Sequence, residues 1–144
     1  MLIDLVLGLP TMALCLLTQS LIFIKAIRYY SRKDYLVKNP SFAASLLVVN
    51  GVMLLLVLGN FMQIAIWALL FRLVGEFQAF DAAFYHSAVN FATLGYGDIV
   101  MSERHRLLGP IESVNGVLMI GISTAALTAA FRNAMEKTIQ ARRR

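Results

Sequence analysis

The chain has 144 residues, of which 59% are hydrophobic and 15% charged, and its mean hydropathy is +0.71. This composition excludes an ordinary water-soluble domain and favours the bilayer as the solvent. The formal net charge of +5 agrees better with basic flanks at a cytoplasmic membrane face than with a nucleic-acid partner. Cys15 is the single cysteine, so no intrachain disulfide can form, and we expect a small buried residue there.

The first predicted element is a membrane span within residues 1–28. The run from Leu5 to Ile24 contains no charged residue and, at about 20 residues, can cross the hydrocarbon core. A signal peptide is the competing interpretation, but no Lys or Arg precedes the run and no small-residue cleavage site follows it. We therefore predict a retained span with its N-terminus outside the cell.

A basic cytoplasmic linker is predicted over residues 29–41. Lys25, Arg28 and Arg32, before and within it, have the helical spacing of a voltage sensor. They lie at the end of a span, however, and the sequence has no four-helix sensor domain. We interpret them as an anchor at anionic lipid headgroups.

A second span is predicted from Asn39 to Phe71, where no charged residue occurs. The run is longer than one bilayer crossing requires, and Ser41 is a suitable N-cap for it. Asn60 and Gln63 lie at helical spacing within it. They can hydrogen-bond to the short helix that follows or to a neighbouring subunit, or lie at the membrane interface. Trp67 suits the interface or packing against the next helix.

A short helix is predicted over about Ala82 to Ala92, after an outer loop covering Arg72–Phe80. At about 11 residues it cannot span a bilayer, so we interpret it as a re-entrant helix that surrounding protein must shield. Asp81 is predicted to cap its N-terminus. The negative end of its dipole would point into the next segment and favour a cation there.

That next segment consists of six residues: Thr93, Leu94, Gly95, Tyr96, Gly97 and Asp98. Alternate glycines allow positive φ, so that successive carbonyls can point the same way. A column of such oxygens, with the Thr93 hydroxyl at one end, can replace the water shell of an alkali cation. A Gly-rich turn in another kind of membrane protein is the competing interpretation.

The segment resembles the selectivity filter of potassium channels, usually Thr-Val-Gly-Tyr-Gly, with Leu94 in place of the valine. The resemblance covers residues 42–136, the predicted pore domain. It implies an all-α membrane protein with three transmembrane helices, a re-entrant pore helix and a selectivity-filter loop. It also implies K⁺ ions in the filter, no organic cofactor, and five K⁺-binding residues: Thr93, Leu94, Gly95, Tyr96 and Gly97.

The same resemblance places Asp98 at the outer mouth, tied to an aromatic side chain of the pore helix. Tyr85 or His86 occupies that region here. A contact between His86 and Asp98 would couple the mouth to outside pH, because histidine titrates near neutrality. The alternative is that His86 is a packed polar residue. We expect the ring of Tyr96 to pack against the pore helix.

The last predicted span covers about Pro110 to Phe131, or begins near Ser102, and a basic tail follows at residues 137–144. Gly116 and Gly121 are candidate hinges, because glycine permits the φ/ψ change of a bending helix. Helix packing is the alternative role for either glycine. Three hydroxyl residues can line a cavity or bond back to their own helix: Ser123, Thr124 and Thr128.

Many potassium channels carry a carboxylate inside the pore helix, behind the filter. This chain has Val89 at the matching place, with Asn90 beside it, which argues against filter control by an acid of that kind. Glu112, near the start of the last span, is expected to be favourable at a helix N-terminus. A role behind the filter is the alternative.

Charge sets the predicted orientation. Ten of the 13 Lys and Arg residues lie in or near the linker and tail, and three lie in the outer loops. The positive-inside rule therefore places the linker and the tail on the cytoplasmic side of a cell membrane. The Asp98 end of the filter then faces the outside. One chain supplies one filter strand and has no internal repeat, so we predict a homotetramer with the first span at its periphery.

The resemblance thus implies passive, potassium-selective conduction by a homotetramer that contacts anionic lipids at its cytoplasmic face. Two alternatives remain: a channel that also passes Na⁺, and a non-conducting membrane subunit that keeps the fold. Nothing in the sequence supports an enzyme, since it contains no metal-ligand cluster, nucleophile elbow or phosphate loop.

Overall fold

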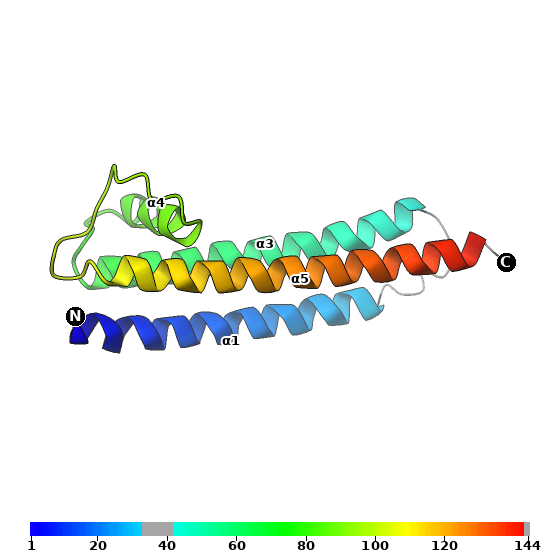
Figure 1. Ribbon diagram of the computed structural model, residues 1–144, viewed down its shortest axis with the longest axis horizontal. Helices are drawn as coiled ribbons and strands as arrows, with labels where there is room; N and C mark the ends of the chain where they lie inside the picture. The colour runs from blue at the N-terminus through cyan, green and yellow to red at the C-terminus, as the bar shows by residue number, and fades with distance from the viewer. Residues whose placement is uncertain (33–41, 143–144) are drawn as a thin grey trace. The chain divides into compact units, whose positions relative to one another are not determined.

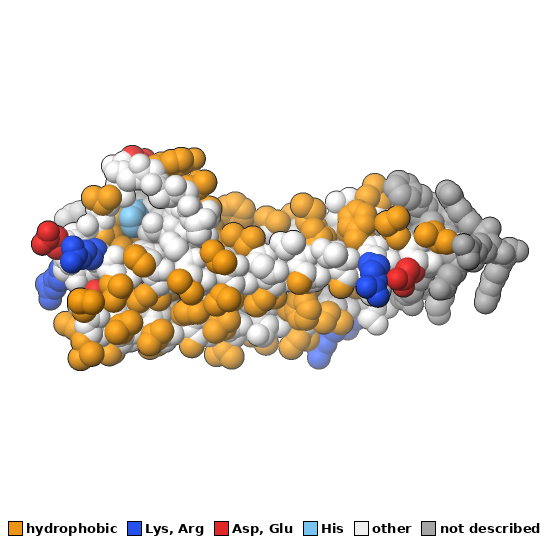
Figure 2. All heavy atoms as spheres, viewed as in Figure 1, with side chains coloured by type: hydrophobic (Ala, Val, Ile, Leu, Met, Phe, Trp, Pro, Cys, Tyr) orange, Lys and Arg blue, Asp and Glu red, His pale blue; other side chains and the backbone are white. Residues whose placement is uncertain are grey.

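The computed structural model describes residues 1–32 and 42–142. They form four helices and no strand: α1 (Leu2–Arg32), α3 (Phe42–Leu73), α4 (Phe80–Phe91) and α5 (Leu108–Arg142) (Figure 1). Three of these helices, α1, α3 and α5, are long and apolar enough to cross a membrane. Figure 2 shows hydrophobic side chains spread over the visible face. The predicted class, a multi-pass all-α membrane protein, is confirmed.

The helices extend beyond the apolar runs that predicted them. α1 continues to Arg32, because lysine and arginine are good helix formers and a helix need not end with its apolar stretch. α5 begins at Leu108, so Pro110 lies in its first turn, where a missing amide costs least. It ends at Arg142, within the segment assigned to the tail. The predicted N-cap at Ser41 lies outside the described residues.

The chain forms two compact units, and every long helix contributes to both. Unit 1 consists of Met1–Gln19 and Asn60–Ile120, and unit 2 of Ser20–Gly59 and Gly121–Arg144. Unit 1 therefore contains α4 and the filter segment, together with the parts of α1, α3 and α5 that pack around them.

Unit 1 has an apolar core around Trp67, which is fully buried with Cys15, Phe71 and Leu108. Trp67 thus packs in the pore region, and Cys15 is the buried residue that we predicted. A second cluster joins all the helices that flank the filter, with the buried members Ile64, Phe91 and Met119.

Gln63 lies in a polar contact that crosses unit 1. Its Nε2 donates to Gln19 Oε1 on α1 at 2.7 Å, and its Oε1 accepts from Asn115 Nδ2 on α5 at 3.4 Å. All three side chains are buried. Gln63 therefore bonds to the first and last spans, which were not among the alternatives expected for it, because its side chain faces the other two long helices.

Unit 2 has an apolar core of Ala26, Val52 and Leu56. Gly51 allows a close approach within it, since a Cβ at this position would lie 2.5 Å from the hydroxyl oxygen of Tyr29. Packing of small and apolar side chains is therefore what joins the helices here.

Candidate functional site

The short helix α4 delivers the chain to the filter segment. Its 12 residues reach about 18 Å, which is too short for a bilayer crossing. It begins at Phe80, earlier than predicted, with Ala79 as an N-cap that makes no side-chain hydrogen bond. The predicted cap at Asp81 is wrong for this reason. Asp81 lies in the first turn, where its charge still favours the positive end of the helix dipole.

The filter backbone alternates in handedness. Thr93, Gly95 and Gly97 have φ values of 58°, 58° and 73°, so every second residue is left-handed. Glycine adopts such φ without steric cost, whereas a threonine does not. The positive φ expected at the two glycines is found, and the same conformation at Thr93 extends the pattern by one residue.

The Thr93 end of the filter segment is tied to the last turn of α4. The Thr93 amide donates to the Asn90 carbonyl, and the Leu94 amide donates to the Val89 carbonyl, both at 2.9 Å. These bonds use carbonyls that a helix end leaves without an intrahelical partner. The direction of α4 therefore sets the direction in which the filter starts.

The Asp98 end of the filter segment is tied to α4 by Tyr85. Its hydroxyl donates to Asp98 Oδ2 at 2.6 Å, and the Ile99 amide donates to Oδ1 at 3.0 Å. The hydrogen bond with Tyr85 lowers the pKa of Asp98 and raises the pKa of Tyr85. Of the two aromatic candidates, Tyr85 thus holds Asp98 as a carboxylate.

Of the two alternatives for His86, the structure agrees with a packed polar residue, and the hydrogen bonds of its ring go to Ile99 and Asn90. Its Nδ1 lies 3.0 Å from the Ile99 carbonyl, which can only accept, and its Nε2 lies 2.9 Å from Asn90 Nδ2. This pattern requires a neutral ring with its hydrogen on Nδ1. Burial lowers the pKa of His86, which agrees with that form. The ring also packs against two phenylalanines, Phe71 and Phe77.

The rest of the filter is open in a single chain. All residues from Ala92 to Asp98 are exposed, including Leu94 at 54% and Tyr96 at 65%. The expected packing of the Tyr96 ring against the short helix therefore stays a prediction.

α5 packs directly on the C-terminal half of α4. Ser113 Oγ lies 3.0 Å from the Asn90 carbonyl, and a Cβ at Gly116 would lie 2.1 Å from the Phe91 carbonyl oxygen. Gly116 is thus required for helix contact. At Gly121, by contrast, nothing lies within 4 Å of a Cβ, so only this glycine keeps an unobstructed hinge position.

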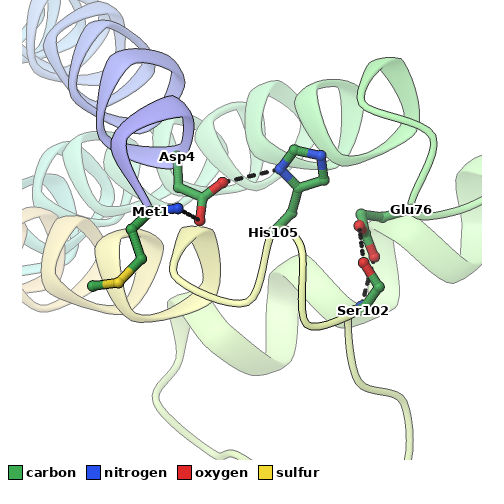
Figure 3. A network of polar contacts seen from close by, with 5 residues as sticks. All are labelled: Met1, Asp4, Glu76, Ser102 and His105. Carbon is green, nitrogen blue, oxygen red and sulfur yellow. Dashed lines mark hydrogen bonds and ion pairs between the residues drawn. The ribbon is translucent and has the colours of Figure 1, made fainter.

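Polar contacts join the start of α1 and the loop before α4 to the segment that follows Asp98 (Figure 3). His105 Nδ1 lies 3.0 Å from Asp4 Oδ1, with both side chains buried, and Asp4 also lies 3.6 Å from the amino group of Met1. The Glu76 carboxylate accepts from the amide and hydroxyl of Ser102 at 2.7 and 2.6 Å. The start of α1 and the loop before α4 are thereby held to the segment that leaves the filter.

Sequence reasoning did not identify the contact between Asp4 and His105, which are 101 residues apart. It also gave Glu112 a role behind the filter only as an alternative. In the structure Glu112 is fully buried and hydrogen-bonded to Ser87 of α4. Two isolated acids in the sequence were the available signals. Asp4 lies at the start of the first apolar run, and Glu112 lies inside the last one.

The described residues contain no group of three or more His, Cys, Asp or Glu side chains that could hold a metal ion. No curated protein and no solved structure matches the chain. A family model described as "ion channel" matches residues 54–133, more than half of the chain. That stretch includes the second half of α3, the short helix, the filter segment and most of α5. The chain therefore belongs to the ion channel family.

Proposed function

We propose that the protein is a potassium-selective channel that conducts K⁺ passively through a homotetrameric pore. The observation that carries this proposal is the left-handed φ at Thr93, Gly95 and Gly97. Such alternation turns successive carbonyls toward one side, where four copies of the strand would surround and dehydrate an alkali cation. Five residues would bind the ion: Thr93, Leu94, Gly95, Tyr96 and Gly97.

The exposed filter supports assembly from four copies. Large apolar side chains at Leu94, Tyr96 and Phe80 are 54%, 65% and 41% exposed in a single chain. Exposed backbone cannot lie in a bilayer unless protein or a water-filled path surrounds it. A ring of four chains would cover these side chains and place the filter on its axis. Helix α1 would lie at the periphery, in contact with lipid.

Topology in the cell membrane follows from charge and from one contact. The excess of Lys and Arg in the linker and tail supports a cytoplasmic position for both, where they would meet anionic lipids. The contact between Asp4 and His105 holds the start of α1 to the segment after the filter. An outer N-terminus agrees with a filter whose Asp98 end faces outside.

The decisive experiment is a flux assay on purified protein in liposomes with K⁺ or Na⁺ gradients. We expect K⁺ flux with a reversal potential close to that for K⁺ alone, and its loss in Gly95→Ala, because a side chain at a φ of 58° is strained. A reversal potential between those of the two ions would establish a weakly selective channel instead. No flux from folded protein would establish a non-conducting subunit.

The assembly is tested separately by cross-linking in detergent. A limiting product of four chains is expected. A limiting product of two chains would contradict the tetramer whatever the flux assay gives.

A further inference from the structure

Ser87 in the pore helix α4 lies between a carbonyl and a carboxyl group. Its Oγ is 2.8 Å from the Ile64 carbonyl oxygen on α3 and is also hydrogen-bonded to Glu112 Oε1 on α5. The side chains of Ser87 and Glu112 are both fully buried. Three helices around the filter thus meet at one hydroxyl group.

The number of hydrogens at this site identifies the form of Glu112. A serine hydroxyl has one hydrogen, and a backbone carbonyl has none to give. If Ser87 donates to Ile64, the hydrogen in its second contact must come from the carboxyl group. The arrangement is therefore complete when Glu112 is a neutral acid that donates to Ser87 Oγ.

The surroundings of Glu112 lead to the same conclusion. The described part of the chain contains three ion pairs, and none of them involves Glu112. Its buried Oε2 makes no close hydrogen bond, and the Asn90 side chain that also interacts with the carboxyl group is a neutral amide that supplies no countercharge. An ionised carboxylate in such a place would carry a large desolvation cost, whereas a neutral acid with one unpaired oxygen costs much less.

The site lies in register with the filter. Glu112, Ser113 and Gly116 follow one side of α5 and meet α4 at Ser87, at the Asn90 carbonyl and at the Phe91 carbonyl. Asn90 also accepts from the Thr93 amide. A shift of α4 along α5 would consequently move the first ion-binding residue.

We propose that Glu112, as a neutral carboxylic acid, is the positioning residue that joins α4 to α5 and fixes the filter at the geometry needed for K⁺ selectivity. The proposal rests on the proposed potassium conduction. The acid acts through Ser87 and contributes no charge to the ion path, so attraction for the cation comes from the filter carbonyls and the dipole of α4. An uncharged donor of similar length would perform the same task.

Infrared difference spectroscopy tests the protonation directly. In wild type minus Glu112→Gln at neutral pH, we expect the carbonyl stretch of a protonated carboxylic acid. Bands of an ionised carboxylate in its place would overturn the proposal. This measurement needs no ion conduction, so it decides the state of Glu112 whether or not the channel function holds.

Flux measurements test the positioning role. Glu112→Gln should keep the K⁺/Na⁺ permeability ratio of wild type, whereas Glu112→Ala and Ser87→Ala should lower it about tenfold, the scale set by one lost buried hydrogen bond. Glu136→Gln, a half-exposed acid on the same helix, is the matched control and should change nothing. A residue with only a structural role would reduce the yield of folded channels without changing the ratio.

Three outcomes remain distinct. A conducting wild type whose ratio is unchanged in Glu112→Ala would overturn the positioning role and leave the channel function intact. A wild type without K⁺ flux would overturn the channel function, and the selectivity role with it. If Glu112→Ala does not fold, Ser87→Ala and the recovery of selectivity in Glu112→Gln still decide the question.

Discussion

The interiors of the two units are stabilised by different interactions. All eight buried polar or charged side chains of the described residues lie in unit 1: Asp4, Gln19, Gln63, His86, Ser87, His105, Glu112 and Asn115. The core of unit 2 is built from apolar side chains such as Val52 and Leu56. In lipid, apolar packing alone gives helices little preference for one rotation or height, whereas hydrogen bonds between helices are directional.

Directional bonds are thus concentrated in unit 1, where the proposed ion site would require a fixed geometry. A site that replaces the water shell of an ion must be held to a fraction of an ångström. Unit 1 has the bonds for this task, from Gln63 in the C-terminal part of α3 to Tyr85 beside Asp98. Substitutions in the two units should therefore differ in their effects on stability and on ion flux.

Gly116→Ala should destabilise unit 1 most. The added Cβ would lie 2.1 Å from the Phe91 carbonyl oxygen, and a backbone atom cannot move aside as a flexible side chain can. We expect a loss of about 3 kcal/mol in the free energy of unfolding, the upper range for overpacking, together with loss of flux. Thermal unfolding in detergent measures the first and the liposome assay the second. Wild-type values in both would show that the helices do not meet as described.

Gln63→Leu should come next. It removes the hydrogen bonds that join Gln63 to Gln19 and to Asn115, at a cost of about 1–2 kcal/mol. A double-mutant cycle with Gln19→Leu isolates the bond, and the double variant should lose less than the sum of the single losses. Simple additivity would mean that the two glutamines do not interact.

Val52→Ala tests the apolar unit. It removes two methyl groups from a side chain that is 4% exposed, and we expect a loss of about 1 kcal/mol. Because no directional bond changes, the K⁺/Na⁺ permeability ratio should stay at the wild-type value. A changed ratio would show that unit 2 also controls filter geometry.

Acid pH should destabilise the folded chain through His86. We expect this loss of stability to be smaller than the losses caused by the substitutions above, because no atom is removed. Burial lowers its pKa, while the nearby carboxylates of Asp98 and Glu76 act in the opposite direction. The unfolded chain therefore binds the proton at higher pH than the folded chain. The stabilisation is complete above the ordinary histidine value of about 6.5 and is lost as pH falls through the lower folded value.

The measurement is the unfolding temperature between neutral and acid pH, with His86→Gln as the control. Part of the pH dependence should disappear in that variant. An identical dependence in both proteins would assign it to other groups.

Gly121→Ala should have the smallest effect on stability. Nothing lies within 4 Å of the added Cβ, and the better helix propensity of alanine should stabilise α5 by roughly 0.5 kcal/mol. If α5 bends at this glycine during opening, flux should fall although stability rises. Unchanged flux would leave Gly121 as a residue of helix packing.

The features that are determined by residues close together in the sequence could be predicted from the sequence alone. The three apolar spans, the short helix and the positive φ at Gly95 and Gly97 follow from local composition. Contacts such as those of Asp4 with His105 and of Glu112 with Ser87 depend on helix rotation and height, which an apolar pattern does not specify. The position within α4 that carries a carboxylate in many potassium channels is Val89 here, whereas the acid that is hydrogen-bonded to α4 comes from α5.

Because the backbone of Thr93 is left-handed, a substitution at this position should change the amount of folded protein and the proposed ion conduction in opposite directions. A threonine in this conformation costs roughly 1–2 kcal/mol, which a glycine would avoid. The same exchange would remove the hydroxyl that lines the inner end of the proposed ion path. In a mutational scan, glycine at this position should therefore rank high in a selection for protein level. It should rank low in a selection for growth that depends on K⁺ uptake through the protein. Any redesign guided by stability alone would choose the wrong residue here.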